Sequence, residues 1–160
     1  MDDTRQQLAT RIGELLADRH LACAESFTAG QLAQAFASAE GSGDWFRGGV
    51  VAYRREVKHR LLDVSPGPLV TRETAVAMAG GVADLIDVEV AVASTGAAGP
   101  SGLDGAPPGD IVIAWIIDGA TGSSEEHIDG DPAEVCARGT DLALELLLAA
   151  LEADEGPTVG

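Results

Sequence analysis

Apolar residues recur along this chain at two spacings, one typical of helices and one typical of strands. The first helix is expected over residues 4–19, where Leu8, Ile12, Leu15 and Leu16 share one face. Four further helices are expected over residues 26–39 and 54–62, from the N-cap Thr71 to Ile86, and from the N-cap Asp131 to about Leu151. Apolar runs predict five strands, over residues 20–25, 48–53, 88–94, 111–117 and 123–128.

The order of these elements predicts the fold class. Strands that alternate with helices and end in a hairpin, with its turn at residues 118–122, indicate a three-layer α/β/α sandwich around a mixed, largely parallel sheet. We expect one domain over residues 1–155 and a disordered tail over residues 156–160. Leucines nearly encircle the last helix, which is therefore expected to be deeply buried or to form an oligomer interface.

Composition and charge exclude several classes of function. The net charge of −16 argues against nucleic acid binding through a basic face, because such binding neutralises phosphates with lysine and arginine. No apolar run reaches the roughly 20 residues that a bilayer requires, and the N-terminus lacks the apolar segment of a secretory signal. We therefore expect a soluble, cytoplasmic protein that binds neither nucleic acid nor a membrane.

The cysteines and histidines do not predict a metal site. Cys23 and Cys136 lie far apart within apolar stretches, which is typical of buried thiols. His20, His59 and His127 are scattered and lack the spacing of metal ligands. We expect no metal and no cofactor.

A single lysine stands out against nine arginines. Lys58 closes the segment Tyr-Arg-Arg-Glu-Val-Lys, which begins with the only tyrosine, Tyr53. Unlike arginine, lysine can lose its proton near physiological pH. A desolvated amine near an arginine has a lowered pKa. Lys58 is therefore a candidate general base. The alternative interpretation is an exposed helix residue retained by chance.

Three polar residues, Ser26, Tyr53 and Ser94, each end a predicted strand. If those strands are parallel, the three meet at one edge of the sheet, where ligands of such folds bind. Ser26 would also begin a helix, whose free N–H groups and dipole can stabilise an oxyanion, although a plain N-cap is the simpler interpretation. Residues 95–109 predict a Gly/Pro-rich loop whose amides can approach a phosphate closely.

Five short motifs occur in series. They are E-S-F-T-A-G at residues 25–30, R-G-G-V at 47–50 leading to Tyr53 and Lys58, S-T-G-A-A-G-P at 94–100, P-G at 108–109 and G-D at 130–131. In their order and spacing the chain resembles the CinA C-terminal domain family, from about residue 5 to residue 150. The resemblance implies the stand-alone form, without the N-terminal domain similar to molybdopterin-binding proteins that the family's other form carries.

The family includes nicotinamide-nucleotide amidohydrolases, also called NMN deamidases, which act in the pyridine nucleotide cycle of NAD metabolism. They convert nicotinamide mononucleotide and water to nicotinate mononucleotide and ammonia. The resemblance implies a metal-independent serine/lysine hydrolase, assembled as a homo-oligomer of two or more copies. By motif position, Ser26 matches the nucleophile, Lys58 the base and Tyr53 the tyrosine that orients them.

We also expect substrate contacts from the motif segments and from the last helix. These residues are Thr28, Ala29, Gly30, Ser94, Thr95, Gly96, Ala97, Gly99 and Arg138. The chain departs from the family at Phe27 and Ala29, where cysteine and glycine are frequent. It also has Pro132 and Cys136 where arginines usually follow the Gly-Asp pair, so Arg138 is the nearby cation.

Losing a charge-assisted contact of this kind costs about 1.5–3 kcal/mol. Two alternatives to the nicotinamide mononucleotide amidohydrolase therefore stay open. One is a non-catalytic module of the same fold that binds a nucleotide or phosphosugar. The other is an amidohydrolase for a different amide.

Overall fold

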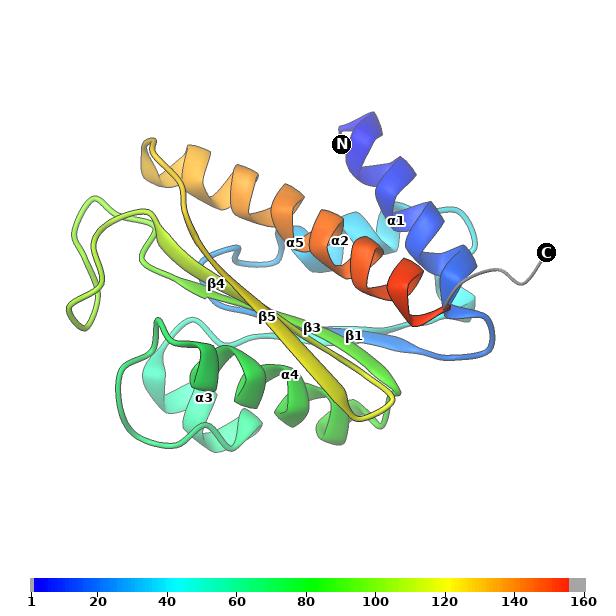
Figure 1. Ribbon diagram of the computed structural model, residues 1–160, viewed down its shortest axis with the longest axis horizontal. Coiled ribbons are helices and arrows are strands. Elements are labelled where there is room, and N and C mark those ends of the chain that lie inside the picture. The colour runs from blue at the N-terminus through cyan, green and yellow to red at the C-terminus, as the bar shows by residue number, and fades with distance from the viewer. Residues whose placement is uncertain (1, 156–160) are drawn as a thin grey trace.

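The computed structural model describes residues 2–155, which form a five-stranded mixed sheet between two layers of helices (Figure 1). The strands are β1 (Leu21–Glu25), β2 (Phe46–Val51), β3 (Val90–Gly96), β4 (Asp110–Ile117) and β5 (Ala120–His127), in the spatial order β2-β1-β3-β4-β5. β1 pairs in parallel with both β2 and β3, whereas β4 pairs antiparallel with both β3 and β5. The predicted three-layer α/β/α sandwich with a mixed sheet is confirmed, and the expected tail at 156–160 lies outside the described residues.

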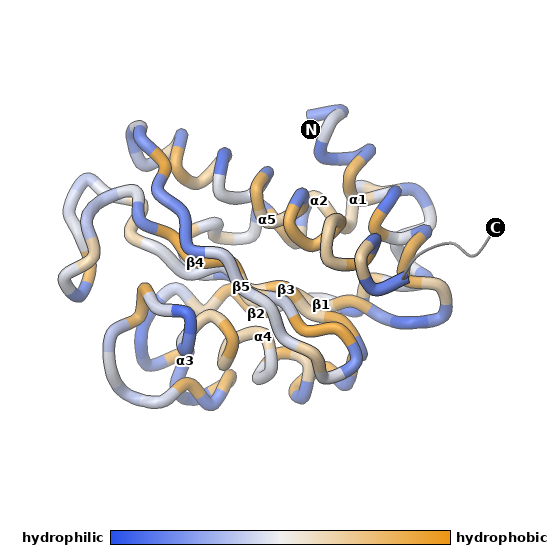
Figure 2. The backbone as a smooth tube through the Cα atoms, in the orientation of Figure 1, coloured by the Kyte–Doolittle hydropathy of each residue, from blue (hydrophilic) through white to orange (hydrophobic). Residues whose placement is uncertain are grey.

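Helices cover both faces of the sheet (Figure 1). α1 (Asp3–Leu16), α2 (Gln31–Ser38) and α5 (Pro132–Asp154) lie on one face, and α3 (Arg55–Leu62) and α4 (Arg72–Ile86) lie on the other. Side chains alternate along β1, so that Cys23 joins the core under the first layer and Ala24 the core under the second. The hydropathy colouring shows the same arrangement, with the apolar central strands enclosed between helices (Figure 2).

The local signals for the starts of α4 and α5 are confirmed. Thr71 caps α4 by accepting a hydrogen bond from the Thr74 amide at 3.1 Å. Asp131 and Glu134 form a reciprocal capping box at the start of α5, with Pro132 in its first turn. The leucines of α5 are buried within this chain to a large extent. Leu144, Leu147 and Leu151 are fully buried, and Leu142, Leu146 and Leu148 pack half-buried against the same core.

The predicted hairpin is confirmed, but its turn is shorter than the predicted residues 118–122. The hairpin turns on two residues only, Asp118 and Gly119, both with positive φ (49° and 85°), as a tight hairpin connection requires. Gly122 belongs to β5, where it pairs with Trp115 of β4. A Cβ at Gly122 would lie 2.4 Å from the indole ring, so this glycine makes room for a side chain rather than for a turn.

Two boundaries next to the expected chemistry also differ from the prediction. The helix expected over residues 26–39 begins at Gln31, and residues 26–30 form a turn in which Ala29 and Gly30 have positive φ. The strand expected over 48–53 spans Phe46–Val51, so Tyr53 lies beyond its end. Both differences arise at the carboxyl edge of the parallel strands, where side-chain contacts override local propensity.

Gly81 tests the packing between the two helices of the second layer. A Cβ at Gly81 would lie 2.1 Å from the carbonyl oxygen of Leu62, at the end of α3, whereas a Cβ at Gly80 meets nothing within 4 Å. We expect Gly81→Ala to lower the free energy of unfolding by about 1–3 kcal/mol, as overpacking does. Gly80→Ala, the control, should raise it by about 0.5–1 kcal/mol through helix propensity. Urea unfolding measures both, and equal stabilities of the two variants would contradict the packing.

Candidate active site

The carboxyl ends of β1, β2 and β3 bring the three predicted segments together. The amide of Ser26 donates to the Ser94 carbonyl at 3.1 Å, which joins the ends of β1 and β3. The amide of Ala52 donates to the Glu25 carbonyl at 2.8 Å, which joins the ends of β1 and β2. Ser26 and Tyr53 therefore follow β1 and β2, and Ser94 lies within β3 opposite the end of β1, so the three meet at one edge of the parallel strands, as the sequence predicted.

A cavity of about 240 Å³ opens beside Ser26. It is somewhat smaller than the roughly 300–1,000 Å³ of typical small-molecule sites, so it suits the reacting end of a ligand. Its lining consists of Ser26, Phe27, Tyr53, Gly96, Ala97, Ala98, Gly99, Ser101, Gly102 and Leu103. None of these side chains is charged. Recognition of an anion in this cavity would therefore depend on backbone amides, which the small residues of the loop leave accessible.

The turn after Ser26 is held by α5 as well as by the sheet. A Cβ at Gly139 of α5 would lie 2.5 Å from the Phe27 ring, so the glycine allows that ring to rest on the helix. The Cys136 thiol donates to the Phe27 carbonyl at 2.9 Å. Among residues 2–155, the amides of Phe27 and Thr28 donate to no protein acceptor. Two N–H groups thus lie free immediately after the candidate nucleophile.

The expected role of the helix N-terminus needs correction. The first-turn amides of α2 are not free for an oxyanion, because the Glu25 carboxylate accepts those of Leu32 at 2.8 Å and Ala33 at 3.1 Å. The Gln31 amide is taken by the Thr28 carbonyl. Glu25 is fully buried and was not among the predicted site residues. A carboxylate at the end of an otherwise apolar strand, Leu-Ala-Cys-Ala-Glu, was the signal that could have identified it.

Lys58 is a buried lysine on α3, only 1% exposed. Its Nζ donates to the carbonyl of Ala52 at 2.7 Å and to that of Tyr53 at 3.2 Å. Burial, with a smaller contribution from the positive charge of Arg55, lowers the pKa of Lys58 from 10.5 to about 8. The alternative of an exposed helix lysine is therefore wrong. Among residues 2–155, no hydrogen bond joins Nζ to Ser26, and Lys58 is not among the residues that line the cavity beside Ser26.

Tyr53 contributes two different groups to this edge. Its carbonyl binds Lys58, and its side chain lines the cavity while remaining 67% exposed. The side chain makes no hydrogen bond to Ser26 or Lys58 among the described residues. Its predicted orienting role stays a prediction, and the backbone carbonyl performs the positioning visible in the structure.

Apart from Arg138, the predicted substrate-binding residues divide into three groups. Gly96, Ala97 and Gly99 line the cavity. Thr28, Ser94 and Thr95 are buried behind it, where the Thr28 and Ser94 hydroxyls lie 2.8 Å apart and the Thr95 hydroxyl donates to the Leu69 carbonyl at 2.8 Å. Ala29 and Gly30 belong to the turn after Ser26 and are not in the lining. Sequence reasoning did not assign the other lining residues, Phe27, Ala98, Ser101, Gly102 and Leu103.

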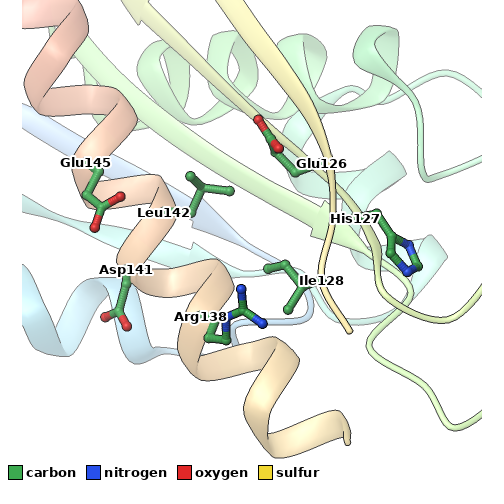
Figure 3. A pocket seen from close by; sticks show the side chains of 7 residues that line it. All are labelled: Glu126, His127, Ile128, Arg138, Asp141, Leu142 and Glu145. Carbon is green, nitrogen blue, oxygen red and sulfur yellow. The ribbon is translucent and has the colours of Figure 1, made fainter. Parts of the chain in front are cut away.

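Arg138 lies elsewhere. It lines a separate hollow of about 360 Å³ between β5 and α5, and this hollow shares no lining residue with the cavity at Ser26 (Figure 3). Its neighbours there include Glu126, Asp141 and Glu145, and its Nη1 donates to the Asp129 carbonyl at 3.3 Å. Within one chain, Arg138 is therefore not brought to Ser26.

The described residues, 2–155, contain no group of three or more His, Cys, Asp or Glu side chains arranged to hold a metal ion. None of the helices in that range is long and apolar enough to cross a membrane. Both cysteines are free thiols, and burial is the largest cause that raises the pKa of Cys23.

Comparison with known proteins decides the family. The family model described as the CinA C-terminal domain matches residues 5–151. The chain belongs to the CinA C-terminal domain family. It is 35% identical over 157 residues to protein YdeJ of Escherichia coli, covering 93% of this chain and 91% of that one. It is 36% identical over 152 residues to a CinA-like protein of Mycobacterium marinum, covering 91% of this chain but only 36% of that relative.

Solved structures give the same family. A CinA superfamily protein of Klebsiella pneumoniae has a TM-score of 0.89 and 29% identity, covering 95% of this chain and 99% of that one. The competence/damage-inducible protein CihA of Agrobacterium tumefaciens has a TM-score of 0.85 and 30% identity, covering 95% and 98%. These likenesses establish the family and fold of this CinA C-terminal domain. Its reaction, its assembly and its site residues remain predictions.

The single lysine of this CinA C-terminal domain makes its pKa directly measurable. With lysine labelled at Cε and Nζ, one NMR resonance should report the titration of Lys58. We expect a midpoint near pH 8. Arg55→Gln should raise this pKa, because it removes a positive charge that disfavours the ammonium. Arg60→Gln, which neutralises an exposed cation on the same helix, is the control. A midpoint near 10.5 in the unmodified protein would show that the amine is not desolvated.

Proposed function

We propose that this CinA C-terminal domain is an amidohydrolase that uses Ser26 as nucleophile and Lys58 as base, with nicotinamide mononucleotide as substrate. The observation that supports it most is the buried amine of Lys58, with its lowered pKa, at the sheet edge that also carries Ser26. Burying an ammonium group costs free energy. Residues whose pKa is strongly lowered by burial cluster at functional sites, so a buried lysine at the edge that carries Ser26 indicates chemistry. The resemblance of the motifs to nicotinamide-nucleotide amidohydrolases supplies the substrate.

The two carbonyls that hold Lys58 suit the action of a general base. A neutral amine has two N–H bonds and one lone pair. The carbonyls of Ala52 and Tyr53 can each accept a hydrogen bond from one of these N–H groups. The lone pair is then directed away from the carbonyls and is free to take a proton. In the proposed mechanism, Lys58 takes the Ser26 hydroxyl proton through one water or after releasing the longer bond, to Tyr53.

The reaction then proceeds by acyl transfer. Ser26 Oγ attacks the carboxamide carbon, and the free amide of Phe27, a residue that lines the cavity, stabilises the oxyanion in place of the α2 N-terminus. Lys58 returns the proton to the departing nitrogen, and the C–N bond breaks to release ammonia. Water, activated by the same amine, then attacks the acyl-enzyme, so that the nicotinate product leaves and Ser26 regains its proton.

The size of the cavity sets how the substrate lies. The nicotinamide ring enters beside Ser26 and Tyr53, and the ribose and phosphate extend over the loop of Ala97–Leu103. The exposed ring of Tyr53 offers a face to the pyridinium, a contact worth about 0.5–2 kcal/mol. Backbone amides of the loop hold the phosphate. Because the lining carries no charged side chain, an amidohydrolase for an uncharged amide is the runner-up.

Two substitutions test the proposed chemistry. Ser26→Ala should lower ammonia release from nicotinamide mononucleotide at least about a thousandfold. Lys58→Arg keeps the positive charge but removes the base, and should lower it at least about a hundredfold. Ammonia is followed in the metal-free protein, and circular dichroism establishes that each variant is folded. Arg60→Lys, an exposed exchange on the same helix, should leave turnover unchanged.

Near-normal turnover by Lys58→Arg would exclude Lys58 as the base. A rise in melting temperature with nicotinamide mononucleotide but without ammonia would indicate the non-catalytic binding module. Turnover of other amides only would support the runner-up.

The pH dependence of the reaction should follow Lys58. The neutral amine is the active form. Well below pH 8, kcat/KM should therefore increase about tenfold for each unit of rising pH, and above pH 8 it should level off. Arg55→Gln should move the rising limb to higher pH, in the same direction as the NMR titration. A limb near pH 6.5, or one insensitive to Arg55→Gln, would assign the base to another group.

A further inference from the structure

We propose that Glu25 is a positioning residue, whose buried carboxylate holds the turn that carries Ser26 in register with Lys58. The proposal rests on the function proposed above. Glu25 ends β1 and directly precedes Ser26, with its side chain on the apolar face that also receives Cys23. It is 0% exposed, and within residues 2–155 no basic side chain pairs with it. A carboxylate buried among apolar side chains without a cation requires an explanation.

The carboxylate is satisfied by donors from the turn and from α2. Oε1 accepts the Thr28 hydroxyl at 2.7 Å and the Leu32 amide at 2.8 Å, and Oε2 accepts the Ala33 amide at 3.1 Å. The N-cap residue of α2 is Gly30, which has no side chain to cap the helix. The Glu25 side chain therefore caps the N-terminus of α2. The turn of residues 26–30 lies between the backbone of Glu25, which precedes it, and the Glu25 carboxylate, which binds Thr28 and the first turn of α2.

The proton of Thr28 gives the network a direction. Because that hydroxyl donates to Glu25, it can only accept from Ser94, 2.8 Å away. The Ser94 hydroxyl is thus the donor of this pair, and the Ser94 carbonyl accepts the Ser26 amide at 3.1 Å. The hydroxyls of Thr28 and Ser94 are committed to each other and to Glu25. They fix the backbone of Ser26 from behind rather than facing the cavity.

The backbone of Glu25 connects the same network to Lys58. Its carbonyl accepts the Ala52 amide at 2.8 Å, and the Ala52 carbonyl accepts Lys58 Nζ at 2.7 Å. Glu25 is therefore joined by a peptide bond to Ser26, the nucleophile, and by a hydrogen bond to Ala52, whose carbonyl holds Lys58. Loss of the carboxylate should free the turn of residues 26–30 while leaving the anchor of Lys58 in place.

The test compares Glu25→Gln, Glu25→Ala and Thr28→Val. The glutamine keeps one acceptor but presents an NH₂ group to the Ala33 amide. The valine removes the hydroxyl that donates to the Glu25 carboxylate and, with it, the link to Ser94. Three quantities are measured: the rate at which a fluorophosphonate probe modifies Ser26, kcat and KM with nicotinamide mononucleotide, and hydrogen exchange of the Ala29 amide, which donates to the Ser26 carbonyl. Leu147→Ala, a fully buried substitution in α5, controls for general loss of stability.

We expect Glu25→Gln to slow probe labelling and kcat at least tenfold together with little change in KM, and to speed Ala29 exchange at least tenfold. Thr28→Val should show a smaller effect of the same kind. Leu147→Ala should lower the melting temperature without changing labelling. Wild-type labelling and exchange in Glu25→Gln, or an equal loss of labelling in Leu147→Ala, would overturn the proposal.

The two proposals fail in different ways. If the unmodified protein neither reacts with the probe nor releases ammonia, the serine hydrolase function fails. Exchange of Ala29 then decides alone whether Glu25 holds the turn. If Glu25→Ala does not fold, the glutamine and valine variants still decide.

Discussion

The hydrogen bond between the Ala52 amide and the Glu25 carbonyl joins the two halves of the site. On one side, Glu25 leads into Ser26 and the turn that packs Phe27 against α5. On the other, Ala52 presents its carbonyl to the buried amine of Lys58. The bond exists because β1 and β2 run parallel, so that their ends leave the sheet in the same direction. A shift of register between these two strands would separate the nucleophile from the base.

Much of the fold was predictable because its signals are local. Thr71 and Asp131 mark helix starts through their own side chains, and continuous apolar runs mark the strands of a sheet covered on both faces. The hairpin turn and the start of α2 were not predictable in this way. Gly122 resembles a turn residue until the indole of Trp115 is placed over it, and Ser26 resembles an N-cap until Glu25 takes the helix amides. Both errors come from contacts that one side chain makes with the backbone of another segment, which local sequence patterns do not report.

The candidate site shows the same division. That Ser26, Tyr53 and Ser94 meet at one edge follows from the order of the strands, which the sequence indicates. Which of them face the cavity depends on how each strand ends. The Ser94 and Thr28 hydroxyls lie behind the cavity, 2.8 Å apart, whereas the Tyr53 side chain lines the cavity and is largely exposed. Arg138 was placed near the site by its position in the sequence, but α5 carries it to the hollow beside β5. Sequence spacing gives no information about which side of a helix a residue will face relative to a distant loop.

The separation of the two buried ionisable side chains, Glu25 and Lys58, has a chemical consequence. Within residues 2–155, Glu25 and Lys58 form no ion pair, although both are buried and linked through Ala52. An adjacent carboxylate would favour the ammonium and raise the pKa of Lys58, which would leave little free base near neutral pH. Two amides and the Thr28 hydroxyl hold Glu25, and carbonyls hold Lys58, so each group is satisfied without the other. A carboxylate can thus organise the backbone around a base without stabilising the protonated form of that base, and an arginine, which keeps its proton, could not replace it.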